Sequence, residues 1–255
     1  MTQKPGDPEG RTTDLFFQLA SLDRKRILTE LQKETLHLNE VAKRVDMTAT
    51  EALRQLQRMT EACLLEKTGD GKYRLTPYAK LVLETSSPLG FISRFREYFL
   101  ERDTSLLPCE YRGRLGELSG SKLIPTTMET LNMVTRMLKN ARQKIDGTVE
   151  IGFELHQQIM CQRLAEGVEV RWLMQESFSD AARSMFRSAD KHPEIRVIPR
   201  IFGHVYLTDR AAAFCLRRTD GAMDYSAFFG EDASFLKWAG DLFAHEWQNA
   251  KPWYP

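Results

Sequence analysis

Cationic, hydroxyl and amide side chains recur between residues 43 and 74, at spacings that place several of them on common faces. A guanidinium group can form two hydrogen bonds with a guanine edge or with a phosphate, and hydroxyl and amide groups can bond bases or the sugar-phosphate backbone. These are the side chains with which proteins hold a nucleic-acid duplex. The candidates are Lys43, Arg44, Thr48, Thr50, Arg54, Gln57, Arg58, Lys72 and Arg74.

Two short helices must position most of these side chains. In the first, apolar residues at spacings of three and four predict one inner stripe, made of Leu38, Val41, Ala42 and Val45. The second begins after residues 46–48, with Thr48 as N-cap and Glu51 completing a capping box. Its inner stripe is predicted to contain Ala52, Leu56, Met59 and Cys63. The outer face then keeps Thr50, Arg54, Gln57 and Arg58, and Arg54 is the expected base reader.

A β-hairpin is predicted next. Residues 64–67 and 72–75 resemble two strands, and residues 69–71, Gly-Asp-Gly, suit a tight turn. Lys72 and Arg74 alternate with apolar residues, so both cations share one face that could lie along a phosphate backbone. Helix, turn, helix and hairpin together predict a winged helix-turn-helix that binds double-stranded DNA.

The alternative is a module of the same shape that binds proteins without touching nucleic acid. The outer-face cations favour DNA binding. The net charge of the whole chain is only +1, and Asp46, Glu51 and Glu61 partly offset the local cations. Non-specific affinity for DNA should therefore be modest and strongly salt-dependent.

Length and composition fit two soluble globular domains. The chain has 255 residues, of which 42% are hydrophobic and 28% charged. No apolar run approaches the roughly 18 residues of a membrane span. Residues 1–11 contain no apolar signal core and are expected to form a disordered tail. We therefore expect a cytoplasmic protein with no membrane association.

The four cysteines lack the Cys-x-x-Cys spacing of zinc and redox sites, so neither a metal nor a cofactor is expected. Cys63, Cys161 and Cys215 continue apolar patterns and should be buried as small hydrophobic residues. Cys109, beside a proline and a glutamate, is the one expected to be exposed, with redox sensing as a minor alternative.

The expected winged-helix domain covers residues 12–86. Its leading helices are predicted at residues 14–19 and 22–31, and a later helix is predicted to close at residues 86–88. Residues 87–121 are expected to form a helical linker and dimer region. The aromatic stretch at residues 91–99 should serve both the core and a dimer contact.

Residues 122–255 are predicted to form an effector-sensing domain with a three-layer α/β arrangement, which makes the whole chain α+β. A long helix should begin at Thr126 or Thr127, with Met128 on its apolar face. Further strands are predicted at residues 149–151, 168–173, 195–198, 205–207, 211–216 and 225–229, and further helices at residues 154–165, 178–189 and 232–249.

Five short segments carry a family resemblance, and it extends from about residue 20 to the end. They are Arg74-Leu75-Thr76-Pro77-Tyr78, Tyr98-Phe99-Leu100 with Leu107-Pro108, Arg114-Leu115-Gly116-Glu117-Leu118, Thr208-Asp209-Arg210-Ala211 and Trp238-Ala239-Gly240-Asp241-Leu242-Phe243. The chain resembles archaeal ArsR-type winged-helix regulators with a C-terminal domain of the methanogenesis regulatory protein (Fil) type. The resemblance implies a homodimeric transcription regulator whose C-terminal domain senses a small-molecule effector. One departure is Cys63, where such proteins commonly have glycine, so a different helix end is expected there.

No enzyme motif supports catalysis, and we expect none. The sequence has no His-Glu-x-x-His, no glycine-rich phosphate loop and no Gly-x-Ser-x-Gly elbow. The C-terminal half resembles phospholipase D-like sheets, whose chemistry needs a histidine, a lysine two residues on and a later aspartate. Here Tyr206 takes the place of that lysine after His204, and Asp209 comes too early. An enzyme with an unrecognised site remains an alternative.

The same region is the expected effector site. Polar anchors beside an aromatic wall could bind a ligand, and the residues proposed are Trp172, Phe202, His204, Tyr206, Asp209 and Trp238. The simpler interpretation makes His204 and Tyr206 ordinary strand residues and Asp209 a turn former. The sequence leaves these two interpretations open.

Overall fold

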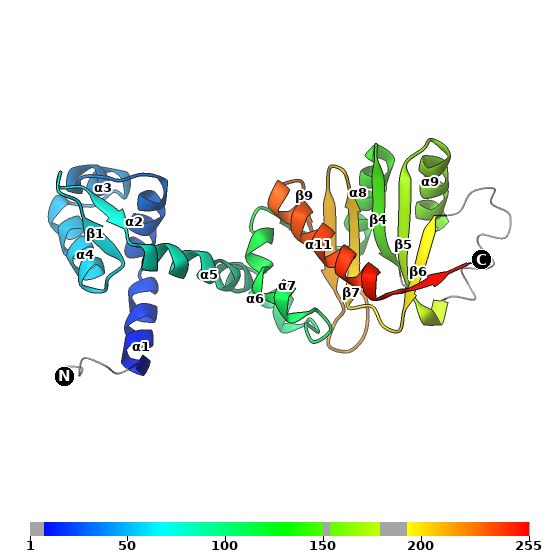
Figure 1. Cartoon of the computed structure of the whole chain (residues 1–255), viewed down its shortest axis with the longest axis horizontal. Coiled ribbons are helices and arrows are strands. Elements are labelled where there is room, and N and C mark those ends of the chain that lie inside the picture. Colours follow the sequence, from blue (N-terminus) through cyan, green and yellow to red (C-terminus); the bar gives the residue numbers. More distant parts are fainter. Residues whose placement is uncertain (1–7, 150–153, 179–192, 255) are drawn as a thin grey trace. The chain divides into compact units, whose positions relative to one another are not determined.

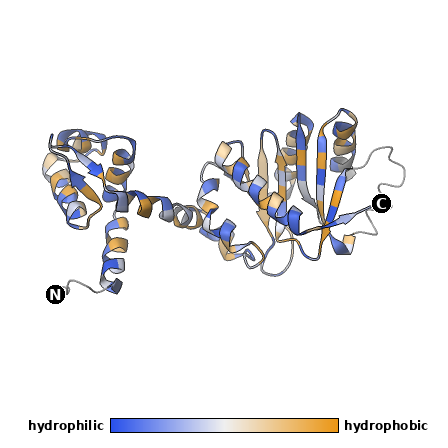
Figure 2. Cartoon of the chain, in the orientation of Figure 1, coloured by the Kyte–Doolittle hydropathy of each residue, from blue (hydrophilic) through white to orange (hydrophobic). Residues whose placement is uncertain are grey.

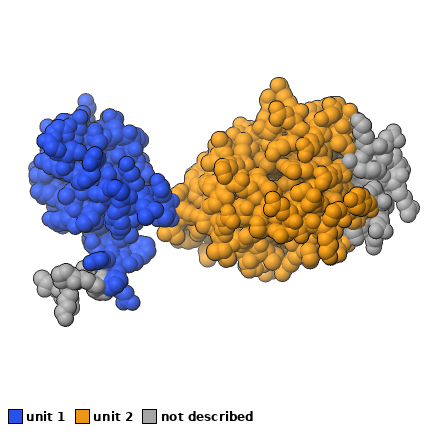
Figure 3. All heavy atoms as spheres, viewed as in Figure 1, with its two compact units in different colours: residues 1–86 blue, residues 87–255 orange. Residues whose placement is uncertain are grey.

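The computed structural model describes residues 8–149, 154–178 and 193–254 (Figure 1). The chain divides into two compact units, residues 1–86 and 87–255 (Figure 3). Each unit has its own apolar core, and we describe each by itself. The architecture combines a small helical unit with a unit built on a large mixed sheet, in agreement with the predicted α+β class.

The N-terminal unit contains helices, a two-stranded hairpin and the start of a long helix. In chain order these elements are α1 (Pro8–Leu19), α2 (Leu22–Lys33), α3 (Leu38–Arg44), α4 (Ala49–Glu61), β1 (Leu65–Lys67), β2 (Tyr73–Leu75) and α5 (Pro77–Arg94). The element order predicted for residues 38–75 is confirmed. Leu36 forms an additional backbone bridge with Tyr73, so a third extended segment joins the hairpin.

Helix α1 begins earlier than predicted. Residues 8–11 are helical, so the expectation of a disordered tail through residue 11 is wrong for them. Pro8 occupies the first turn, where its missing N–H costs nothing, and Glu9 lies at the positive end of the helix dipole. The hydroxyls of Thr12 and Thr13 donate to carbonyl oxygens one turn earlier. Local interactions therefore extend the helix.

Helix α5 passes through Pro88, although the sequence predicted that the helix closes there. A proline inside a helix removes one hydrogen bond and costs about 3 kcal/mol. Phe91, on the following turn, is only 2% exposed and belongs to the core of the C-terminal unit. Burial of a phenylalanine contributes about 1.5 to 3 kcal/mol, which offsets most of that cost. Tertiary packing therefore overrides the local signal.

The end of helix α4 also differs from the expectation. Cys63 adopts a left-handed conformation with φ of 60°, the conformation that glycine favours at this place. The Cys63 N–H donates to the Thr60 carbonyl at 3.0 Å and the Leu64 N–H to the Met59 carbonyl at 2.9 Å. This is the glycine-type helix end, formed without glycine, so the expectation of a different geometry is wrong. Cys63 is exposed, so the expectation that it is buried on the inner stripe of α4 is wrong.

The C-terminal unit has an eight-stranded mixed sheet with the order β10-β6-β5-β4-β7-β8-β9-β3. Strands β4, β5 and β6 are parallel, and the remaining neighbours are antiparallel. The strands are β3 (Lys122–Ile124), β4 (Lys144–Val149), β5 (Glu169–Gln175), β6 (Glu194–Ile198), β7 (Gly203–Thr208), β8 (Ala212–Leu216), β9 (Ala227–Gly230) and β10 (Lys251–Trp253). The helical elements are α6 (Arg96–Leu100), α7 (Cys109–Gly113), η1 (Leu115–Leu118), α8 (Thr127–Asn140), α9 (Glu154–Ala165), η2 (Glu176–Phe178) and α11 (Ala233–Asn249).

Helices cover both faces of this sheet, which makes the predicted three layers. Helix α11 packs on one face, and α8 and α9 pack on the other (Figure 1). Every residue of the central strands β7 and β8 is buried, and hydrophobic residues follow these strands in Figure 2. Alternate residues therefore contribute to two separate cores. Val205 belongs to the core under α11, whereas Tyr206 belongs to the core under α8 and α9.

Residues 87–121 form part of this unit, so their description as a linker is wrong. Tyr111, Leu115 and Leu118 are buried in the core under α11. The Tyr111 hydroxyl donates to the Asp241 carbonyl at 3.0 Å, and the Trp238 indole N–H donates to the Tyr111 carbonyl at 3.2 Å. The glycines and polar residues that suggested a connection belong to short turns held against α11.

The aromatic stretch of residues 91–99 also contributes to this core. Phe91 and Tyr98 are buried, and Phe95 and Phe99 pack against the same cluster. Each of these four rings lies within about 6 Å of the Phe228 ring, from 4.8 to 6.1 Å between centroids. The core role predicted for this stretch is confirmed, and its role in a dimer stays a prediction.

Several smaller expectations are corrected. Cys161 is exposed because Ile159 and Met160, just before it on α9, face the core, whereas Cys215 is buried and Cys109 exposed as predicted. Met128, the second residue of α8 after the N-cap Thr126, is 67% exposed and does not lie on the apolar face. Of the strand expected at residues 149–151, only Val149 is described, as the last residue of β4, and residues 150–151 lie outside the described residues. Strands β3 and β10 were not predicted. The helix expected at residues 178–189 falls almost entirely outside the described residues.

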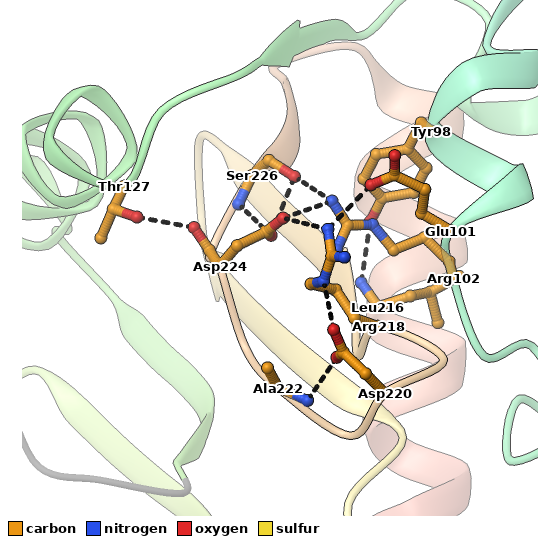
Figure 4. A network of polar contacts seen from close by, with 10 residues as sticks. All are labelled: Tyr98, Glu101, Arg102, Thr127, Leu216, Arg218, Asp220, Ala222, Asp224 and Ser226. Atoms are coloured by element: carbon orange, nitrogen blue, oxygen red, sulfur yellow. Dashed lines mark hydrogen bonds and ion pairs between the residues drawn. The ribbon is translucent and has the colours of Figure 1, made fainter.

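A buried arginine fastens α6 to the end of the sheet (Figure 4). The Arg102 side chain is 4% exposed and donates to the Asp224 carboxylate at 2.7 Å and to the Ser226 hydroxyl at 2.6 Å. Its guanidinium lies 4.5 Å from the centre of the Tyr98 ring, and the Tyr98 hydroxyl accepts from the Leu216 N–H. Burial alone would raise the pKa of Asp224, but the hydrogen bonds from Arg102 and Ser226 hold that pKa below its ordinary value.

Replacing Cys63 with glycine should stabilise the N-terminal unit by about 1 kcal/mol, because a side chain in the left-handed region is strained and glycine is not. Urea denaturation followed by circular dichroism measures the change. Ala62→Gly is the control at a neighbouring position of ordinary backbone conformation: Ala62 has φ of −79°, so glycine there adds freedom to the unfolded chain, removes a methyl group packed against the core, and should destabilise. Destabilisation by Cys63→Gly would contradict the left-handed geometry.

Asp224→Ala should destabilise the C-terminal unit by about 2 kcal/mol, because it leaves a buried guanidinium without its carboxylate. The free energy of unfolding in urea is the measurement. Glu101→Ala is the control, since Glu101 pairs with Arg218 at an exposed position and its loss should matter little. Equal effects of the two substitutions would show that the buried ion pair of Arg102 and Asp224 stabilises the protein no more than an exposed ion pair does.

Candidate nucleic-acid interface

Burial of one side of α4 determines which side chains face solvent. Ala52, Leu56 and Met59 are completely buried, as the sequence predicted. Gln55 is also buried, and its side-chain oxygen accepts a hydrogen bond from Arg24 at 3.3 Å. Gln55 follows Ala52 by three residues, so the same helical spacing could have placed it on the inner side.

Arg24 is the buried anchor of this arrangement. Its guanidinium also donates to the carbonyl oxygens of Gln18 at 2.9 Å and Phe17 at 2.7 Å. Burial lowers the pKa of Arg24, and the nearby positive charge of Arg58 lowers that pKa further. Arg24, on α2, therefore ties α4 to the last turn of α1. Its burial could not be predicted from the sequence, because one polar residue in an amphipathic helix gives no signal of burial.

The start of α4 is held by the predicted capping box. The Thr48 hydroxyl accepts from the Glu51 N–H at 3.2 Å, and the Glu51 carboxylate accepts from the Thr48 N–H at 3.1 Å. The Thr48 hydroxyl also donates to this carboxylate. This side-chain hydrogen bond is the main cause that lowers the pKa of Glu51, and the hydrogen bond from the Thr48 N–H lowers it further. Thr48 therefore serves to begin the helix, and its hydroxyl is already engaged.

The outer face of α4 is exposed. It consists of Thr50, Arg54, Gln57 and Arg58. Neither Arg54 nor Arg58 forms an ion pair with any residue that the structure describes, and the same holds for Lys43 on α3. These guanidinium groups are therefore available to a polyanion without first giving up a carboxylate.

The remaining candidate cations have acidic partners within the unit. Arg44 lies 2.7 Å from Glu34, and this hydrogen bond raises the pKa of Arg44. Arg74 lies 2.7 Å from Glu66 on the paired strand. A phosphate must compete with these carboxylates, so we expect such cations to contribute less than the outer face of α4.

The hairpin is a regular antiparallel pair, and we call it the wing. Its turn is closed by the Thr68 N–H, which donates to the Lys72 carbonyl at 2.8 Å, and by Gly71 with φ of 85°. Lys72 and Arg74 alternate with the buried Tyr73, so both cations share the solvent side as predicted. Lys72 lies 3.5 Å from Asp70 in the same turn.

The six residues proposed for an effector are not brought together. Trp172 and Tyr206 belong to the core under α8 and α9, whereas Phe202 and Trp238 belong to the core under α11. The sheet separates the two groups, so they cannot form one aromatic wall. The expectation failed because the sequence showed apolar strands without showing which face each residue occupies.

Asp209 has a structural role. Its carboxylate accepts backbone N–H groups of Arg142 at 2.8 Å and Gln143 at 3.1 Å. Burial by itself would raise the pKa of Asp209, but these two hydrogen bonds outweigh it and lower that pKa. The carboxylate thus clasps the end of α8 to the turn between β7 and β8, which agrees with the simpler interpretation of Asp209.

His204 and Tyr206 line a small internal cavity together with His156 and Tyr225. Its volume is about 20 Å³, enough for one water molecule. The His204 ring Nδ1 lies 2.8 Å from the Thr148 carbonyl, and the His156 ring Nε2 lies 3.1 Å from the Thr135 hydroxyl. In this form the cavity is too small for a metabolite.

Neither a helix that could span a membrane nor a cluster of metal ligands is found among the described residues. None of the helices described is long and apolar enough to cross a membrane. Over the same residues, no group of three or more His, Cys, Asp or Glu side chains is placed to hold a metal ion.

No family model and no curated protein matches this chain. Among solved structures it is similar to TrmBL2, an archaeal chromatin protein, with 14% identity, a TM-score of 0.44 and coverage of 96% of this chain and 99% of that one. NucT from Helicobacter pylori shows 11% identity, a TM-score of 0.43 and coverage of 52% and 98%. Nuc from Salmonella typhimurium, a phospholipase D family member, shows 10% identity, a TM-score of 0.43 and coverage of 53% of this chain and 99% of that one. Similarity at this level defines neither a family nor an activity for the chain.

Burial of His156 should make the C-terminal unit less stable in mild acid. Burial lowers the pKa of His156 below 6.5, so the unfolded chain binds a proton more readily than the folded one. The free energy of unfolding should therefore fall as the pH falls from 6.5 towards the folded-state pKa. Chemical denaturation at several pH values measures this slope.

His156→Gln should flatten the slope in that window. Burial raises the pKa of Glu246, so this group makes the free energy of unfolding fall as the pH rises above 4.5. Glu246 is present in both the natural protein and the variant, so its contribution cancels when their slopes are compared. An identical pH dependence in the two proteins would show that His156 titrates alike in the folded and unfolded chains.

Proposed function

We propose that this protein is a sequence-specific DNA-binding transcription regulator, and that its N-terminal unit is a winged-helix domain. One observation carries the proposal: the outer face of α4 presents Arg54 and Arg58, exposed and without ion pairs to described residues, on a helix whose opposite side is completely buried. A helix held in this way can enter a major groove and offer two guanidinium groups to base edges.

The wing would then lie along the sugar-phosphate backbone. Lys72 and Arg74 project from one side of it, and phosphate contacts of this kind fix position without reading sequence. Lys43 and Arg44 on α3 would contact the backbone on the other flank of α4. The ion pairs of Arg44 and Arg74 would exchange a carboxylate for a phosphate, which makes the affinity sensitive to salt.

The regulator would act as a homodimer in the cytoplasm. Two copies of α4 about 34 Å apart can read successive major-groove faces, so the operator should contain two related half-sites. The C-terminal unit would sense a small molecule and would not act as an enzyme. A ligand that prefers one arrangement of the two DNA-binding units would change operator affinity, since only differential binding shifts such an equilibrium.

A protein-interaction module is the second candidate. The acidic partners of Arg44, Lys72 and Arg74 favour it, because they lower the net charge beside α4. A module of this kind would show no affinity for duplex DNA even at low salt. Selection of duplexes from a random library by the full-length protein, at two salt concentrations, separates the two functions and supplies the operator.

Arg54→Ala should weaken binding to that operator by about 1 to 3 kcal/mol and relax preference at one position, because a base-contacting guanidinium is lost. Lys72→Ala should weaken all sequences alike and reduce the salt dependence. Fluorescence anisotropy with the operator and its single-base variants measures both effects.

Lys80→Ala is the matched control, since it removes an exposed cation from α5, outside α4 and the wing. Its effect on operator affinity should be small at moderate salt. If Arg54→Ala binds the operator as the natural protein does, α4 is not the reading helix.

A further inference from the structure

The C-terminal unit has an open groove of about 830 Å³ that none of the roles above uses. It is bordered by the second half of α8, by the turn between β7 and β8 and by the end of β9. Among the described residues, five cationic side chains and one carboxylate line it, and we call it the cationic groove. These residues are Arg136, Lys139, Arg142, Arg163, Arg210 and Glu231.

Among the described residues, carboxylates lie beside two of the five cations: Glu166 beside Arg163, and Asp209 beside Arg210. Arg136, Lys139 and Arg142 form no ion pair with any residue in the described ranges. Arg210 lies 3.6 Å from Asp209, but that carboxylate already accepts the two N–H groups that clasp the end of α8. A chain of net charge +1 therefore concentrates positive charge in one hollow. Such a concentration attracts anions.

The positions of these cations are set by the fold. The Asp209 clasp holds the backbone of Arg142 beside the turn that bears Arg210. The Arg163 guanidinium donates to the Ala141 carbonyl, which fixes it to the same wall. Because α8 ends here, its carbonyl groups also favour cations. The groups are thus arranged before any ligand arrives.

Apolar side chains also line the groove. They are Met137, which is 5% exposed, and the partly buried Met133 and Phe229. Concave sites of roughly 300 to 1,000 Å³ are typical of small-molecule ligands. A duplex, by contrast, presents its phosphates on a convex surface and has no use for apolar side chains among the cations.

We propose that the cationic groove binds a small organic phosphate of the nucleoside di- or triphosphate class. Arg142 and Arg210 contact the phosphates, with Arg163 behind them, and the base lies over Met133 and Phe229. This inference rests on the part of the proposed function that makes the C-terminal unit a small-molecule sensor, and it gives that unit a site and a class of ligand. It holds or fails whether or not α4 binds DNA.

The test uses the full-length protein and a fluorescent ADP analogue, N-methylanthraniloyl-ADP, followed by anisotropy at low ionic strength. The analogue should bind, and unlabelled ADP and inorganic pyrophosphate should displace it. Arg142→Glu combined with Arg210→Glu should weaken binding at least tenfold, because it reverses two charges in the groove. Arg200→Glu combined with Lys251→Glu makes the same change of net charge at exposed positions elsewhere, and it should alter affinity less than twofold.

Three results would overturn the proposal: no binding of the analogue at millimolar protein, equal weakening by the two double variants, or displacement by a DNA duplex but not by pyrophosphate. The last would assign the groove to a nucleic-acid backbone. The duplex competition is repeated with Arg54→Ala combined with Arg58→Ala, so that binding through α4 does not confuse it. If the first double variant does not fold by its thermal melt, Arg136→Glu combined with Lys139→Glu on the exposed side of α8 replaces it, with the same tenfold expectation.

Discussion

Burial of one side of α4 is the constraint on which the N-terminal unit depends. Ala52, Leu56 and Met59 lie completely inside the core, and the helical repeat of 3.6 residues then leaves only one direction for Arg54 and Arg58. Rotating the helix to hide the arginines would expose three apolar side chains and bury two charges. Hydrophobic packing, which has no direction of its own, thus fixes the direction of the polar face.

Two polar devices refine that orientation. The capping box of Thr48 and Glu51 determines where the helix begins, and the buried Arg24 joins Gln55 to the last turn of α1. Burying a guanidinium is costly unless its donors are paired, and here carbonyl oxygens and an amide supply the partners without an opposing charge. Contacts at its start and along its inner side therefore hold α4 in place, and the side chains of the outer face take no part in this.

In the C-terminal unit, the sheet determines where charged side chains can lie. Strands β7 and β8 are buried on both faces, so neighbouring residues on one strand enter different cores. Charged residues are excluded from these strands and collect where the strands and α8 end. The cationic groove and the Arg102 network both lie at such ends. In the groove, three of the five cations form no ion pair with described residues, whereas the Arg102 guanidinium is bonded to Asp224 and Ser226.

What the sequence by itself determined was local. Helical spacing placed the inner stripe of α4, the capping residues marked its start, and Gly-Asp-Gly marked the turn of the wing, because each of these signals acts within a few residues along the chain. Only the tertiary structure decided that α5 continues through Pro88, and that Phe202 and Trp238 lie across the sheet from Tyr206. It also decided that cations from α8, α9 and a distant turn share one groove. Those outcomes depend on packing between residues far apart in the sequence, and no spacing along the chain records which of them will meet.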